Sequence, residues 1–465
     1  MTLYAGIVSP FFYPYIHEFI NPKLQTSSAL NLMDALTKRP KQNRRSIHRL
    51  VAWAFYDWAN SAFPTVILTF VFSSYFTSRV ASSETTGSSL WGYAVGTAGI
   101  AVALLAPLMG AAIDQRGDRR RWLVAATLTC AACTSCLWFI RPDAAYVAPA
   151  MIIFGLALIS YEISAFIYNA MLPHLAPPNH IGRWSGWGWA LGYAGGLVCL
   201  IAVLVLFVHE NAVLTKMIPS QAARHIRVSF AFVALWYTLF ALPLLLLAPS
   251  RRARVSIRQS IRQAYQQLYE SLHSARQYRH IIWFLAARMI YTDGLATIFV
   301  FGGVFAATAF DLSETHILWF GITLNISAGA GAALFAWLDD FLGSKSVILI
   351  ALGGLAIAGT VAVATHSQPV FWIAGAILGI FVGPVQSASR SYLARSAPPR
   401  LQNQMFGLYV FSGKATAFAG PLMVGFITDL TGSHRLGMGA ILVLLTTGFL
   451  MMIRAQPVQR TPASS

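Results

Sequence analysis

Residues 90–121 read LWGYAVGTAGIAVALLAPLMGAAIDQRGDRRR, an uncharged stretch that runs directly into a charged loop. The uncharged part, residues 90–113, exceeds the roughly 20 apolar residues that a helix needs to cross about 30 Å of hydrocarbon. Backbone N–H and C=O groups in lipid must be satisfied within their own segment, which favours a helix. The stretch therefore predicts a transmembrane helix that ends at a basic loop.

The same pattern recurs along the chain. Apolar stretches of spanning length cover about 51–78, 90–113, 122–140, 146–172, 185–208, 228–249, 281–309, 315–338, 346–365, 370–393, 405–428 and 436–453. Hydrophobic residues make up 56% of the 465 residues and charged residues 11%, against roughly 25% charged in soluble domains. This composition excludes a cytosolic enzyme, a disordered chain and a secreted disulfide scaffold. We expect an all-α polytopic membrane protein with twelve transmembrane helices.

Basic residues predict the orientation. The 33 Lys and Arg outnumber the 16 Asp and Glu, for a formal charge of +17. Most of the Lys and Arg residues fall before the first predicted helix, in the loops after the even-numbered helices, and at the C-terminus. Lys and Arg concentrate in cytoplasmic loops, so we expect both termini in the cytoplasm, and the plasma (inner) membrane if the chain is bacterial.

One long hydrophilic segment, 250–280, separates six predicted helices from six. We divide the chain into a cytoplasmic tail (1–50), a six-helix bundle (51–249), a linker (250–280), a second six-helix bundle (281–455) and a cytoplasmic C-terminal tail (456–465). The linker places Ile257, Ile261, Ala264, Leu268 and Leu272 at helical spacing among arginines. We expect an amphipathic helix on the cytoplasmic surface, in contact with anionic lipid headgroups rather than with nucleic acid.

Short sequence repeats relate the two halves. The string Asp114-Gln115-Arg116-Gly117 has a counterpart in Asp340-Phe341-Leu342-Gly343, 226 positions later. NAMLPHLAPP at 169–178 matches RSYLARSAPP at 390–399, 221 positions later. These offsets predict two pseudo-symmetric six-helix bundles.

The first repeat resembles the loop signature of the major facilitator superfamily. The residues that match are Gly110, Asp114, Gly117, Arg119 and Arg120, with a shorter copy at Asp340, Gly343 and Lys345; Gln115 stands where that family usually has a basic residue. An Asp near helix ends, with arginines beside it, can form a charge lock between the halves that opening would break. The alternative is a plain basic loop with a helix-capping Asp.

A second resemblance is narrower. WAFYDWANSAF at 53–63, Tyr291–Gly294 and FGLYVFSGK at 406–414 are similar to the unknown-major-facilitator branch of that superfamily, which includes the fungal vacuole effluxers of autophagy. The resemblance implies a secondary active transporter that works by alternating access. It also implies a small polar, amino acid-like solute moved by efflux, because the fungal relatives are implicated in moving amino acids out of the vacuole.

Six ionisable residues fall inside predicted spans, and such residues are functional candidates by default because they are costly in lipid. Asp57, Glu162 and Asp293, with the polar neighbours Asn60, Tyr161 and Asn169, are predicted to line a cavity or carry protons. Lys414, Arg390 and Arg288 are predicted to pair with these carboxylates or with a substrate anion. The two arginines lie close enough to the inner helix ends to snorkel to the interface. The alternative for each is a structural ion pair or hydrogen bond that holds the helices in register.

The remaining patterns predict neither a cofactor nor a catalytic site. The chain shows no phosphate-binding glycine loop, metal-ligand cluster or nucleophile constellation, so we expect no enzyme, no cofactor and no metal. We expect a monomer that binds a small-molecule substrate and protons. The alternative function is a transporter-fold receptor or scaffold without net flux, which would typically add a large soluble sensory domain.

Overall fold

The computed structural model describes residues 47–208, 221–249, 255–273 and 278–456. The described residues from Leu50 onward belong to one compact unit. Most of both predicted tails, and residues 250–254 and 274–277 of the predicted linker, lie outside the described residues.

The described residues form helices joined by short turns, with no strand among them. Eleven of these helices are long and apolar enough to cross a membrane. They are α3 (Glu84–Arg116), α4 (Arg119–Cys136) with its short extension to Phe139, α5 (Val147–Leu175), α6 (Ile181–Val203), α7 (Arg224–Leu247), α9 (Arg279–Phe310), α10 (Glu314–Leu342), α11 (Ser344–Ala364), α12 (Gln368–Ser396), the pair α13 (Gln402–Lys414) and α14 (Ala419–Thr431), and α15 (His434–Arg454). The prediction of an all-α polytopic membrane protein is confirmed.

The first predicted span, 51–78, is helical, but its hydrogen bonding changes from the α-helical to the π-helical pattern at Phe63. Residues 50–60 are α-helical and are followed by the π-helix η2 (Phe63–Phe70), α2 (Val71–Tyr75) and the π-helix η3 (Phe76–Val80). Pro64 lacks the N–H that would bond the carbonyl of Asn60, which is the physical reason for a break in the α-helical register here. We call residues 50–80 helix 1.

The span predicted over 405–428 is present but is not one continuous helix. Residues 415–418 form a turn that separates α13 from α14, and we call the pair helix 11. Pro421 cannot donate a hydrogen bond to the carbonyl of Ala417, and its ring crowds that carbonyl. The break leaves Lys414 at the end of α13 and Gly420 in the first turn of α14.

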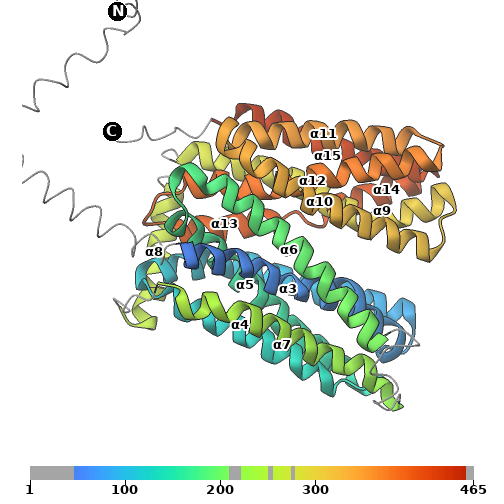
Figure 1. The fold of residues 1–465 in the computed structure, drawn as a ribbon, viewed down its shortest axis with the longest axis horizontal. Coiled ribbons are helices and arrows are strands. Elements are labelled where there is room, and N and C mark those ends of the chain that lie inside the picture. Colours follow the sequence, from blue (N-terminus) through green and yellow to red (C-terminus); the bar gives the residue numbers. More distant parts are fainter. Residues whose placement is uncertain (1–46, 209–220, 250–254, 274–277, 457–465) are drawn as a thin grey trace, which may run out of the picture. The chain divides into compact units, whose positions relative to one another are not determined.

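The helices fall into two groups, an N-terminal group of helix 1 with α3–α7 and a C-terminal group of α9–α15 (Figure 1). The groups meet mainly where α3 packs on α13 and α6 on α10. A Cβ built on Gly110 of α3 would overlap the backbone of Asn403, and one on Gly186 of α6 would overlap Ala332 and Ala336 of α10. Glycine thus permits both close approaches.

We name the two ends of the helices by their turns. The end that carries residues 117–118, 176–180 and 397–401 is the basic end, and the end that carries 81–83, 311–313 and 365–367 is the opposite end. At the basic end the helix α8 (Ile257–His273), which covers the middle of the predicted linker, packs against α3 through Ala264, Ala111 and Ala112.

Candidate functional site

A cavity of about 660 Å³ lies between the two groups of helices. Its lining includes Ser61, Thr65, Tyr161 and Tyr193 of the N-terminal group and Phe320 and Asn325 of the C-terminal group. These positions lie from mid-helix toward the opposite end, and no charged side chain contributes to the lining. The cavity therefore offers hydroxyl, amide and aromatic groups to a solute.

About one helical turn from the cavity toward the basic end, Arg390 of α12 reaches into the N-terminal group. Its Nη1 donates to Asp57 Oδ2 at 2.9 Å and to Asn169 Oδ1 at 3.0 Å. Its Nε donates to Ser185 Oγ at 2.9 Å and its Nη2 to the Ser185 carbonyl at 2.6 Å, and its guanidinium lies 4.8 Å from the Trp53 ring centre. All of these partners lie on helix 1, α5 and α6, so a single buried side chain ties the two groups together.

Arg390 pairs with Asp57 and does not snorkel to the interface, which its position near the helix end also allowed. The side chain is 2% exposed. A buried guanidinium is tolerated when its donors are satisfied and a carboxylate neutralises it, and the N-terminal group supplies both.

A second ion pair crosses between the groups closer to the cavity. Lys414 Nζ lies 2.7 Å from Glu162 Oε1, and the lysine side chain is 34% exposed against 15% for the glutamate. Tyr161, the neighbour of Glu162, lines the cavity and stacks on Phe63. The partly exposed Lys414–Glu162 pair is thus accessible to water, whereas Arg390 is not.

Arg288 and Asp293 stay within the C-terminal group. Arg288 Nη1 donates to the Tyr409 carbonyl at 2.6 Å and to Ser412 Oγ at 2.8 Å, with its guanidinium 3.4 Å from the Tyr409 ring centre. These partners lie at a similar depth in α13, so Arg288 does not snorkel either. Asp293 accepts a hydrogen bond from the Gly420 N–H at 2.9 Å and does not meet Asp57.

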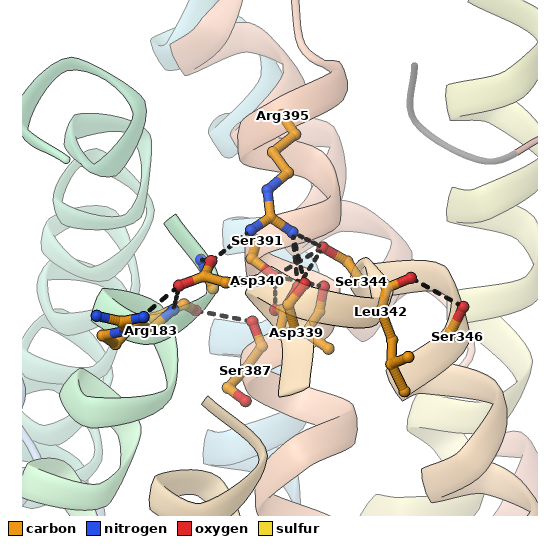
Figure 2. Close-up of polar contacts among 12 residues, drawn as sticks. Arg183, Asp339, Asp340, Leu342, Ser344, Ser346, Ser387, Ser391 and Arg395 are labelled. Carbon is orange, nitrogen blue, oxygen red and sulfur yellow. Dashed lines mark hydrogen bonds and ion pairs between the residues drawn. The ribbon is translucent and has the colours of Figure 1, made fainter. Parts of the chain in front are cut away.

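At the basic end, Asp340 of α10 bonds to the first turn of α6 (Figure 2). Its Oδ1 accepts from the Gly182 N–H at 2.8 Å and its Oδ2 from the Arg183 N–H at 3.1 Å. Arg395 donates to Asp340 at 2.7 Å and to the neighbouring Asp339 at 2.6 Å. A carboxylate on the free N–H groups of a helix N-terminus is a favourable cap, so Asp340 locks α10 to the opposite group.

Asp114 makes the equivalent lock in the other direction. Its Oδ2 accepts from the Gln404 N–H at 2.9 Å and its Oδ1 from Asn403 Nδ2 at 2.7 Å, in the first turn of α13. Asp114 and Asp340 are 226 positions apart, and Arg183 and Gln404 are 221 apart, which are the two offsets of the sequence repeats. The duplicated carboxylates therefore cap duplicated helices across the interface.

Among the other residues of the loop signature, Arg120 and Lys345 bond within their own group. Arg119 lies 3.3 Å from Asp114. Arg120 donates to the Leu245 carbonyl near the end of α7 at 2.7 Å, and Lys345 donates to the Ile453 carbonyl near the end of α15 at 2.8 Å. Neither of these two bonds crosses to the other group. Gly117 and Gly343, at φ of +80° and +89°, end α3 and α10 in a conformation that favours glycine.

Several residues of the site escaped the sequence analysis. They are Ser185, Arg183, Asp339, Arg395, Asn403 and Gln404. The polar pair Asn403-Gln404 at the start of an apolar span was a usable signal, as was its alignment with 182–183 at the 221-residue offset. Ser185 gave no signal, because its role depends on which helix lies opposite.

Comparison with known proteins gives a consistent result. The sequence model of a family described as "Vacuole effluxer Atg22 like" matches residues 178–461. An "Uncharacterized MFS-type transporter YxiO" of Bacillus subtilis (strain 168) is 24% identical over 404 residues, which cover 86% of this chain and 93% of that protein. "Autophagy-related protein 22" of Cryptococcus neoformans var. neoformans serotype D (strain B-3501A) is 25% identical over 286 residues, 57% of this chain and 50% of that protein. The chain thus spans about half the length of the fungal relatives that it matches.

Solved structures of low sequence identity share the fold. The proton:xylose symporter XylE bound to 6-bromo-6-deoxy-D-glucose aligns over 90% of this chain and 98% of its own, with a TM-score of 0.66 and 15% identity. The major facilitator superfamily transporter FucP in the outward conformation aligns over 88% of this chain and 98% of its own, with a TM-score of 0.67 and 14% identity.

Proposed function

We propose that this chain, which belongs to the family of vacuole effluxer Atg22-like proteins, exports a small polar solute in exchange for, or together with, protons. The chain is a secondary transporter of the major facilitator superfamily, a class that is not enzymatic. The solute, the direction of transport and the proton coupling are our proposal.

The observation that carries the proposal is the presence of two ion pairs between the groups of helices. Arg390–Asp57 and Lys414–Glu162 lie beneath a cavity that both groups line. In alternating access one group rocks against the other around a central site. Opening the basic end requires both pairs to separate, together with the Asp114 and Asp340 caps. The four contacts support a state closed at the basic end.

The lining of the cavity supports a small polar solute. Hydroxyl and amide groups of Ser61, Thr65, Tyr193 and Asn325 can bind polar atoms, and aromatic rings can cover apolar ones. The adjacent Lys414–Glu162 pair offers one charge of each sign. A zwitterion such as an amino acid would find a partner for its carboxylate and its ammonium there.

We place the basic end in the cytoplasm, with both termini, because Lys and Arg favour that side. Efflux is supported by the description of the family as vacuole effluxers. A solute leaving the cytoplasm would enter at the basic end and leave through the cavity at the opposite end. At the basic end, α8 would lie against anionic headgroups.

A two-stage experiment tests the proposal. A thermal-shift screen of the purified full-length protein against amino acids, peptides and sugars identifies a solute, because a ligand of the folded state raises its apparent stability. Uptake of that solute into proteoliposomes is then driven by a pH gradient. We expect flux in the wild type and strong loss in Asp57→Asn and Glu162→Gln. Binding without flux would favour a receptor and contradict the proposal.

A further inference from the structure

The break in helix 11 lies beside a buried carboxylate that none of the described ion pairs neutralises. Asp293 of α9 is 3% exposed. Its Oδ2 accepts from the Gly420 N–H at 2.9 Å, while its Oδ1 has no hydrogen-bond partner among the described residues. A buried carboxylate in this condition is costly, unless a cation joins it.

The neighbouring cations are engaged elsewhere. Arg288, five residues earlier on α9, bonds to α13. Lys414 of α13 pairs with Glu162, and Arg390 of α12 pairs with Asp57. The other charged or histidine residues of α10, α12, α14 and α15 lie within about one turn of a helix end: Glu314, His316, Asp339, Asp340, Arg395, Asp429, His434, Arg435 and Arg454. Tyr291, two residues before Asp293, bonds to Ser389.

The Thr297 hydroxyl lies on the same side of Gly420 as the free carboxylate oxygen. Thr297 Oγ1 donates to the Asp293 carbonyl at 2.8 Å, so its lone pairs remain available. A Cβ built on Gly420 would overlap Thr297 Oγ1 and lie 3.1 Å from Asp293 Oδ1, so both oxygens lie against the first turn of α14. Pro421 leaves the Ala417 carbonyl in the break without its helical donor. Carboxylate, hydroxyl and carbonyl oxygens are the ligands of hard cations.

We propose that Asp293 and the break in helix 11 form the binding site of a monovalent cation, either a proton on Asp293 or a sodium ion, that drives transport. The inference rests on the proposed function and deepens it. Of the three carboxylates inside the spans, Asp57 and Glu162 are already neutralised by ion pairs, and Asp293 is the one that is not. These two pairs then act as locks, and Asp293 is the site of the coupling ion.

The geometry links this site to one of the locks. Gly420, which Asp293 holds, and Lys414, which holds Glu162, flank the turn 415–418. A cation on Asp293 weakens the attraction of the carboxylate for the N-terminus of α14. The turn can then shift, and Lys414 moves relative to Glu162.

Thermal unfolding of the purified full-length protein, without any solute, tests the site. The probes are protons, by comparing mildly acidic with mildly alkaline buffer, and Na⁺, by replacing choline chloride with sodium chloride in alkaline buffer. The wild type should gain melting temperature on acidification if the ion is a proton, or with Na⁺ if it is sodium. We expect Asp293→Asn to lose at least half of that gain.

Two further variants keep the test decisive. Asp429→Asn removes an exposed carboxylate from α14 and should keep the whole gain, which controls for other titrating groups. Asp293→Glu retains a carboxylate and should keep a measurable gain even if Asp293→Asn does not fold. Three results would each overturn the cation site. They are a rise in melting temperature that is equal in Asp293→Asn and the wild type, no rise in the wild type, and no rise in Asp293→Glu. Because no solute is present, these results are independent of the flux assay.

Discussion

Replacing Arg390 by alanine should open the basic end of the transporter. The guanidinium makes four hydrogen bonds to the N-terminal group, one of them to the Asp57 carboxylate, from a side chain that is 2% exposed. Removing one partner of a buried ion pair costs about 3–5 kcal/mol. These bonds bridge the two groups, and in the proposed cycle they break when the basic end opens. The cost therefore falls on the closed state rather than on the folding of either group.

This cost sets the size of the conformational shift. Since about 1.4 kcal/mol corresponds to a factor of ten, Arg390→Ala should move the closed-to-open equilibrium by roughly a hundredfold to a few thousandfold toward open. A closed state favoured by a few kcal/mol would then become the minor species.

Distances between spin labels across the basic end measure this shift. Asn179, in the turn between α5 and α6, and Arg400, in the turn between α12 and α13, are both exposed and belong to opposite groups. They can be labelled as cysteines after the four native cysteines are replaced. We expect the distance distribution of Arg390→Ala to move to longer values.

A matched arginine supplies the control. Arg435 donates to the Val363 and Thr365 carbonyls within the C-terminal group, so Arg435→Ala should leave the distances unchanged. If Arg390→Ala gave the wild-type distribution while remaining folded, the interpretation of Arg390 as a lock between the groups would be wrong.

Three further predictions use the same distance measurement or the stability of the closed state. Reversing the charges in Glu162→Lys with Lys414→Glu should restore the closed population that either single variant loses, and a double variant as open as the singles would contradict the pairing. Gly110→Ala should push α3 off the Asn403 backbone and open the basic end, whereas Gly99→Ala on the same helix, with nothing within 4 Å, should have no effect. Asp340→Asn keeps the shape of the cap but loses its charge, so the closed state should weaken by about 1–2 kcal/mol, and an unchanged distribution would argue against the cap.

The sequence was a good guide to the elements and to which residues matter. Apolar runs located the helices, and the 226- and 221-residue offsets pointed to duplicated locks at Asp114 and Asp340. The backbone partners of these carboxylates, the N–H groups of Gly182, Arg183 and Gln404, could not be identified from side-chain types, because every residue except proline carries a backbone N–H. They become partners only when α13 or α6 is packed opposite.

Depth along a helix was a poor guide to where a charge points. Arg390 lies near the inner end of its helix, but its side chain points into the protein, where it binds polar and aromatic groups of helix 1, α5 and α6. The break in helix 11 could have been anticipated from Pro421, since its effect on the preceding turn is local. The contact between this break and Asp293 could not have been anticipated, because it depends on α9 lying beside helix 11.

Solute flux in proteoliposomes separates ion-driven transport from binding alone. We expect a solute that stabilises the purified protein to accumulate inside wild-type vesicles when a proton or sodium gradient is imposed. We expect Asp293→Asn still to exchange solute across the membrane at equilibrium but no longer to accumulate it against a gradient. Gradient-driven accumulation by Asp293→Asn at the wild-type rate, or no movement of a bound solute by the wild type, would contradict the account.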